Sequence, residues 1–252
     1  MKIVVAIKQV PDRDATIKIS GGQIDESDLT YTINEPDAYA LEEALQLKEK
    51  NGGEVVVLCA GPERAATTIR EALAKGADRA IHIQSDDLAQ RDTLGLAQLL
   101  ASAIKSESPD LILTGLQSDD LGLGQTGVVL ASVLDIPHAT IIMHVEKTAT
   151  GLRVKRELED GWFQHVDMPL PALLTIQSGG NKLRYATLMG IKKARSKETT
   201  TITDVAAAAP PTITIEKIYM PEKQKQTVML TGSPSEIANQ LVEKLKFEVR
   251  VL

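Results

Sequence analysis

Aromatic residues are scarce in this chain: they make up 3% of it, with a single tryptophan. Surfaces that stack nucleic-acid bases or sugars are built from aromatic side chains, so such surfaces must be few. An excess of basic residues is also missing, because the formal net charge is −6. Both absences argue against nucleic acid as the main partner.

Long apolar runs and cysteines are lacking as well. The longest apolar runs have the length of a strand, which predicts no membrane span. The single cysteine, Cys59, lies in one of these runs, and no basic, apolar leader precedes Met1-Lys-Ile-Val-Val. We therefore expect a cytoplasmic chain that needs no disulfide.

Val, Ile, Leu and Ala dominate the apolar residues, and 252 residues suffice for one large domain with appendages. As far as residue 134, short apolar runs alternate with segments of helical periodicity, which predicts an α/β fold with a parallel sheet covered on both faces. A polar piece with Gly21-Gly22 at its centre is expected to form a hairpin at the sheet edge. The predicted strands are 3–7, 54–60, 77–83 and 110–114, the predicted helices are 34–50, 63–75, 91–105 and 125–134, and the hairpin is 16–24.

After Pro137 the pattern changes to consecutive strand-like pieces joined by turns, which is typical of an antiparallel extension. A further apolar strand is followed by a polar loop at 177–190, which is too long for a mere connector and indicates a function. The strands predicted in this part are 139–145, 152–158, 162–166 and 171–176.

The domain core is expected to end near residue 200, where the chain becomes Thr-rich and then linker-like at Ala206–Pro211. A strand is predicted at 213–219, and a helix at 235–247 with Ser233 or Ser235 as its cap. This helix carries its own apolar face, so residues 201–252 are expected to form an arm that packs on another surface.

The stretch 109–134 joins a buried strand, a loop rich in Gly and Asp, and a helix that opens at Gln-Thr-Gly. Unpaired N–H groups and the positive end of a helix dipole would meet there beside the Thr126 hydroxyl, which suits a phosphate. In parallel sheets ligands lie beyond the carboxyl ends of the strands, so Ala6–Val10, Ala60–Gly61 and Gly115–Gly127 should converge. Alternatively, the glycines only shape a surface loop.

Catalytic patterns are weak. The histidines lack metal-ligand spacing, which favours core or surface roles, and neither a P-loop with its lysine nor a dinucleotide GxGxxG fingerprint is present. Asp119 and Asp120 could form a metal or carboxylate site, but a role in shaping the loop is favoured. We expect no catalytic or metal-binding residues; the histidines are His82, His138, His144 and His165.

Several segments together resemble one family: VAIKQVPD, NEPDAYALEEAL, VVVLCAGP, GLQSDDLGLGQTG and LPALLTIQSGGNKLRYATLMGIKKARSKE. They are similar, in collinear order over about residues 1–200, to the β (small) subunit of electron-transfer flavoproteins. The resemblance implies a Rossmann-like nucleotide-binding domain at 1–200 and a linker with an arm at 201–252 that packs on a larger α subunit. It also implies an electron carrier rather than an enzyme, with the redox FAD held mainly by α.

The resemblance further implies an AMP in this subunit. The family's loop ends in Asn-Gln-Thr-Gly, and Gly124 replaces the asparagine here, so one side-chain contact is lost while backbone donors remain. A variant of the family holds a second FAD in place of AMP, but its loop lacks the Gln-Thr-Gly ending, so AMP is favoured. The residues implied for cofactor binding are Ala6, Asn34, Ala60, Gly122, Gly124, Gln125, Thr126 and Gly127.

In this family the loop around RYATL recognises a flavin-containing dehydrogenase, and its leucine matches Leu188. Tyr185 and Met189 are implied as its neighbours in docking, and the flanking cations Lys182 and Arg184 are expected to speed the encounter with an acidic partner surface. On the residues alone, Leu188 could instead start the helix toward Ala194 and pack inward.

Three positions depart from relatives: Arg13 and Pro36 stand where some present aromatic side chains to the flavin, and Gln164 replaces an acidic residue. The donor dehydrogenase therefore stays open, although the loop is nearer to members that serve amine dehydrogenases. Two other classes also stay open, a universal-stress-like nucleotide sensor and a small nucleotide-dependent ligase or hydrolase. The arm favours the carrier, since a sensor needs none.

Overall fold

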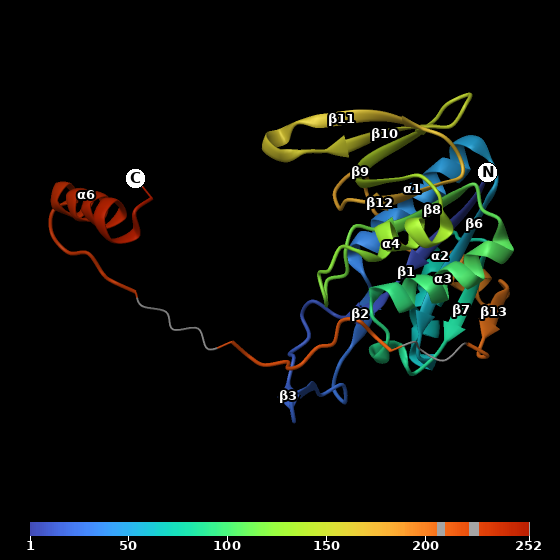
Figure 1. Cartoon of the computed structure of the whole chain (residues 1–252), viewed down its shortest axis with the longest axis horizontal. Coiled ribbons are helices and arrows are strands. Elements are labelled where there is room, and N and C mark those ends of the chain that lie inside the picture. The colour runs from blue at the N-terminus through green and yellow to red at the C-terminus, as the bar shows by residue number, and fades with distance from the viewer. Residues whose placement is uncertain (206–209, 222–226, 252) are drawn as a thin grey trace. The chain divides into compact units, whose positions relative to one another are not determined.

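The computed structural model describes residues 1–205, 210–221 and 227–251, and its main feature is a nine-stranded sheet (Figure 1). The strand order is β11-β10-β9-β12-β8-β1-β6-β7-β13. Neighbours from β9 to β13 run parallel, whereas β10 is antiparallel to β9 and β11. This confirms the mostly parallel sheet with an antiparallel extension. The strands are β1 (Lys2–Ile7), β6 (Glu54–Gly61), β7 (Arg79–Gln84), β8 (Leu111–Gly115), β9 (His138–Lys147), β10 (Leu152–Glu157), β11 (Phe163–Met168), β12 (Ala172–Ile176) and β13 (Thr199–Ile202).

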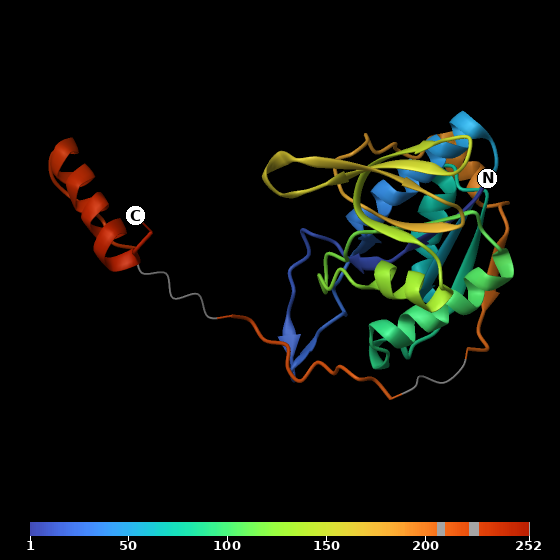
Figure 2. The same cartoon turned by 45° about the horizontal axis from the view of Figure 1, so that its top comes forward.

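Helices cover both faces of the sheet (Figure 2). In β1, Ile3 and Val5 contribute to the core on one face while Val4 contributes to the core on the other, and all three are buried. A strand buried on both sides must be apolar throughout, which explains the continuous runs in the sequence. The first face carries α1 (Glu35–Asn51), α2 (Ala66–Lys75) and α5 (Leu188–Ala194), the second carries α3 (Thr93–Glu107) and α4 (Thr126–Leu134), and the 3₁₀ turns are η1 (Glu63–Ala65), η2 (Leu88–Gln90) and η3 (Glu159–Gly161).

The predicted hairpin lies elsewhere than expected. β3 (Ile19–Ser20) and β4 (Gln23–Ile24) form a two-stranded sheet of their own, and β2 (Gln9–Pro11) pairs with β5 (Tyr31–Ile33) in another. The edges of the large sheet are β11 and β13. The prediction of an edge hairpin was therefore wrong, because strands of two mostly exposed residues offer the sheet neither a ladder nor an apolar face.

The last part of the chain also differs from expectation. Residues 213–219 form no strand, because a strand needs a hydrogen-bonded neighbour and the apolar pattern alone supplies none. The helix is present as α6 (Pro234–Glu243), continued by the π-helical η4 (Lys244–Val249). Ser233, not Ser235, caps it through a capping box with Glu236. Of the predicted linker, residues 206–209 lie outside the described residues.

The chain separates into two compact units, residues 1–18 with 24–216 and residues 19–23 with 217–252. β13, which pairs with β7, spans residues on both sides of residue 200. Among the described residues, no helix has the length and apolar character needed to cross a bilayer.

Candidate functional site

The carboxyl ends of three strands converge as expected. β1 lies between β6 and β8, with Ala6 opposite Leu58 and Val5 opposite Leu113. Ala6 and Ala60 therefore stand near the ends of neighbouring strands, and the glycine loop leaves the end of the third. In a parallel sheet this edge is where ligands bind.

Asn34 ties the glycine loop to the start of α1. Its Nδ2 donates to the Gln117 carbonyl at 2.9 Å, and its Oδ1 accepts from the Asp119 N–H at 2.9 Å. The side chain is 1% exposed and does not cap α1, because both of its polar ends are used on the loop. Asn34 is thus a brace for the loop.

Asp119 and Asp120 also shape this loop. Lys8 Nζ lies 2.7 Å from both carboxylate oxygens of Asp120, and the Leu121 N–H donates to Asp120 at 2.8 Å. Burial works to raise the pKa of Asp120, but the hydrogen bond and charge of Lys8 hold it below its usual value. Asp119 accepts from the Glu35 N–H at 3.4 Å. Within the part of the chain that the structure describes, no cluster of three His, Cys, Asp or Glu side chains could hold a metal ion.

The glycine loop leads into α4, whose N-terminus has no side-chain cap. Gly122 and Gly124 have φ of +63°, a conformation that favours glycine. Gln125 precedes α4 without capping it, and the first turn has no acidic residue. Thr126 is half-buried there. The N–H groups of this turn and the helix dipole therefore favour an anion.

Gly127 has a packing role. A Cβ at this position would lie 2.6 Å from Thr175 Cγ2 and 2.7 Å from Thr114 Oγ1. Glycine therefore lets α4 approach β8 and β12 closely.

Asp37 is a site residue that sequence reasoning missed, because an acid in a first helical turn is ordinary. Its carboxylate accepts from the Lys8 N–H at 2.7 Å and the Gly115 N–H at 2.9 Å, so it links the ends of β1 and β8. Burial raises the pKa of Asp37 to about 7 despite these bonds, and burial raises the pKa of Cys59 to about 12. Cys59 is therefore an inert core thiol.

Leu188 begins α5, but its side chain does not pack inward. It is 88% exposed, and Tyr185 and Met189 are 91% and 64% exposed. Thr187 caps the helix by accepting from the Gly190 N–H at 3.0 Å. The alternative prediction was that Leu188 starts a helix and packs inward. The structure confirms that Leu188 starts the helix and contradicts the inward packing. Because α5 begins at Leu188, the loop predicted at 177–190 ends at residue 187, three residues earlier than expected.

The Arg184 guanidinium does not extend freely beside Leu188. It binds Glu42 through Nε at 2.7 Å and Glu49 through Nη1 at 2.6 Å. These hydrogen bonds raise the pKa of Arg184 above its ordinary value. Arg184 thus joins the loop to α1, and no sequence signal marked this pairing.

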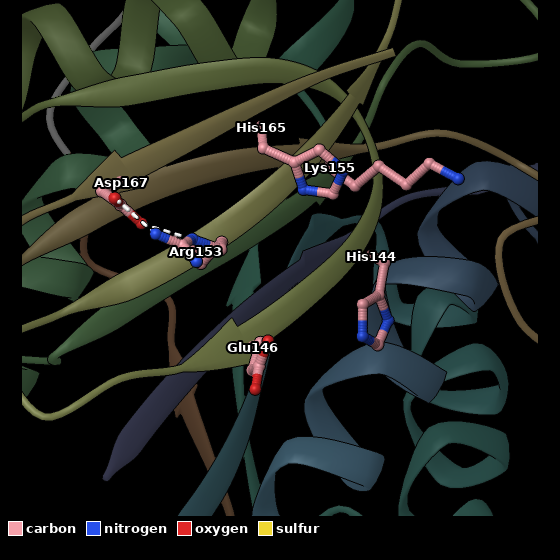
Figure 3. A pocket seen from close by; sticks show the side chains of 6 residues that line it. All are labelled: His144, Glu146, Arg153, Lys155, His165 and Asp167. Atoms are coloured by element: carbon pink, nitrogen blue, oxygen red, sulfur yellow. Dashed lines mark hydrogen bonds and ion pairs between the residues drawn. The ribbon is translucent and has the colours of Figure 1, made fainter.

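A hollow of about 400 Å³ lies on the outer face of the antiparallel extension (Figure 3). Lys155 stands in register between His144 and His165, and Arg153 stands between Glu146 and Asp167. Arg153 pairs with Asp167 at 2.8 Å. His82 instead is buried and hydrogen-bonds the Gly61 carbonyl, while His138 is exposed at the start of β9. The histidines thus occupy core and surface positions.

A family model described as "Electron transfer flavoprotein domain" matches residues 21–208. The chain belongs to the electron transfer flavoprotein family. It is 38% identical to the electron transfer flavoprotein subunit beta of Methylophilus methylotrophus, over 96% of this chain and 97% of that protein. It is 37% identical to the same subunit of Bacillus subtilis over the whole of both chains. A third relative, the acryloyl-CoA reductase electron transfer subunit gamma of Anaerotignum propionicum, is 32% identical over 97% and 98%.

These matches confirm the resemblance to electron transfer flavoprotein β subunits. They support an electron-transfer role for the chain and imply an α subunit as its partner. A stand-alone nucleotide sensor does not fit this family match.

The three positions expected to differ from relatives are accounted for by their surroundings in the structure. Arg13 is exposed and pairs with Glu35 at 2.5 Å, Pro36 is buried in the first turn of α1, and Gln164 is exposed on β11.

Proposed function

We propose that this chain is the cytoplasmic β subunit of a heterodimer in which the α subunit holds the redox FAD. In this proposal the β subunit binds one AMP in a structural role and docks a flavin-containing dehydrogenase through the tip around Leu188. Electrons then pass from the dehydrogenase flavin to the FAD and on to an acceptor.

The nucleotide part of the proposal is carried by the uncapped first turn of α4. Its N–H groups stand beside the Thr126 hydroxyl at the edge where strands β1, β6 and β8 end. Because Asn34 and Lys8 already hold the preceding loop, its backbone is preorganised and little entropy is lost on binding. Gly124 supplies no side-chain contact, so the AMP phosphate would bind to backbone donors and Thr126.

The docking part is supported by the exposure of Leu188 at the start of a packed helix. A large aliphatic side chain that is 88% exposed on an ordered element suits an anchor for a partner pocket.

Acid extraction of the purified heterodimer tests the proposal. We expect one FAD and one AMP per heterodimer. Two flavins without AMP would contradict the AMP assignment, because a second FAD would then occupy the β subunit. A colourless homodimer that hydrolyses ATP would contradict the carrier role altogether.

A further inference from the structure

Two adjacent glutamates of α1, Glu42 and Glu43, are buried, with 5% and 4% exposure. A buried carboxylate costs free energy unless hydrogen bonds or an opposite charge compensate it. The groups that compensate these two carboxylates therefore indicate what they are for.

Glu42 is compensated by Arg184, which lies 142 residues away in the sequence. Nε donates to Oε2 at 2.7 Å and Nη2 donates to Oε1 at 3.0 Å, so the pair is bidentate. The backbone N–H of Arg184 also donates to Oε2 at 3.3 Å. Such a fork fixes direction as well as distance, and Glu49 occupies the other side of the guanidinium.

Glu43 is compensated by the same loop and by the extension. Its Oε1 accepts from the Val145 N–H at 3.0 Å and its Oε2 accepts from Asn181 Nδ2 at 3.1 Å. Gly180 passes so close to β9 that a Cβ there would lie 2.2 Å from the Met143 carbonyl oxygen. Residues 180–184 are therefore held between α1 and β9.

On the other side of the tip, α5 is held against α2. A Cβ at Gly190 would lie 2.3 Å from the Ala74 carbonyl oxygen, so the two backbones touch there. Tyr185 to Met189 are thus the span between two fixed points.

From these contacts we infer that Glu42 and Glu43 are positioning residues for partner docking. They hold Arg184 and Asn181, and so set the direction in which the chain enters α5 and presents Leu188. The inference rests on the docking role proposed for Leu188. Its physical basis is preorganisation: a tip that is already ordered loses little conformational entropy when the dehydrogenase binds.

The test compares heterodimers that carry Glu42→Gln, Leu188→Ala or both. An acyl-CoA dehydrogenase and an amine dehydrogenase serve as electron donors, and the one that reduces the wild-type heterodimer faster is used. We expect Glu42→Gln to raise the KM of the dehydrogenase for the heterodimer about tenfold with kcat nearly unchanged. The reason is that the substitution removes the charged, hydrogen-bonded pair of Glu42 with Arg184. In the Leu188→Ala variant, adding Glu42→Gln should raise the KM little further. The reason is that the direction of the tip no longer matters once the anchoring leucine is gone.

Hydrogen exchange supplies a readout that needs no donor. Amides of residues 181–190 should exchange about tenfold faster in Glu42→Gln, and Arg184→Lys, which keeps one charge but loses the fork, should show a smaller increase. The matched control is Glu107→Gln, which breaks a comparable ion pair between Arg79 on β7 and Glu107 on α3. The side chains of Arg79 and Glu107 are 20% and 14% exposed. Glu107→Gln should lower stability but leave loop exchange and KM unchanged.

The outcomes separate the two proposals. The positioning role would be overturned if Glu42→Gln left both the exchange rates of the loop amides and the KM at their wild-type values. It would also be overturned if Glu42→Gln and Leu188→Ala each raised the KM and their factors multiplied in the double variant. An unchanged KM in Leu188→Ala would instead overturn the docking role, while loop exchange would still decide whether Glu42 orders the tip.

Discussion

Leu188 and its neighbours illustrate how single side chains carry the proposed docking. Replacing Leu188 by Ala should raise the KM of the donor dehydrogenase for the heterodimer about tenfold, because losing ~1.4 kcal/mol of contact weakens binding by that factor. The flavin spectrum and the melting temperature should stay near wild type, since the side chain is 88% exposed.

Leu94→Ala is the matched control, because Leu94 is an exposed leucine at the start of α3, on the other face of the sheet. It should leave the KM unchanged. A fall of many degrees in the melting temperature of Leu188→Ala with unchanged docking would show that Leu188 serves stability instead.

Asp37 predicts a pH dependence of stability at the scale of one carboxyl group. Its folded pKa of about 7 lies above the value of about 3.9 of an unfolded chain. The folded state therefore binds the proton more tightly, so this contribution to stability is full below pH ~4 and is lost as the pH rises through about 7. The loss is on the order of 4 kcal/mol at most.

Urea unfolding of wild type and Asp37→Asn between pH 5 and 8 checks this. The free energy of unfolding of wild type should fall with pH more steeply than that of the variant, which has no proton to lose at this position. The window avoids Glu107, whose pKa Arg79 lowers to about 2 and whose contribution is lost below pH 4.5. Parallel curves would contradict the assignment.

At the scale of elements, α5 depends on its close contact with α2. Gly190→Ala would place a Cβ 2.3 Å from the Ala74 carbonyl oxygen, so the helices must separate. The better helix propensity of alanine gains about 1 kcal/mol, but overpacking against backbone costs typically 1–3 kcal/mol. We expect a net loss of stability by thermal unfolding, together with weaker docking because α5 carries Leu188.

Met189→Ala, one position away and 64% exposed, is the control and should change stability by less than ~0.5 kcal/mol. A Gly190→Ala variant as stable as wild type would show that α5 can shift without cost.

At the scale of the whole molecule, the arm after Glu216 belongs with the second compact unit. α6 and η4 carry large exposed apolar side chains, including Leu241, Val242 and Phe247. We expect that a chain ending at residue 216 keeps the sheet but co-purifies with the α subunit in much lower yield, because the role proposed for the arm is to bury its apolar face against that subunit. Undiminished co-purification of the shortened chain would contradict this role.

Local patterns in the sequence were sufficient for much of the fold. Apolar runs of strand length, helical periodicity and glycines at the ends of helices depend on residues a few positions apart, so the alternation of strands and helices up to residue 134 could be predicted. The glycine loop and the RYATL segment likewise carried the family resemblance. Where a local pattern had no partner to complete it, as at 213–219, no strand forms. The hairpin predicted at 16–24 does form, but local residues could not show that it lies apart from the large sheet.

The sequence by itself therefore determined the order of the main strands and helices as far as residue 176, the family and the position of helix α4. Only the tertiary structure decided that Glu42 binds Arg184, that Asn34 braces the glycine loop, and that Asp37 links two strand ends. The reason is distance along the chain: these contacts join residues from 29 to 142 positions apart. Charged and amide side chains have the same pattern in the local sequence whether solvent or another segment of the chain faces them. Only the folded structure shows which segment lies opposite.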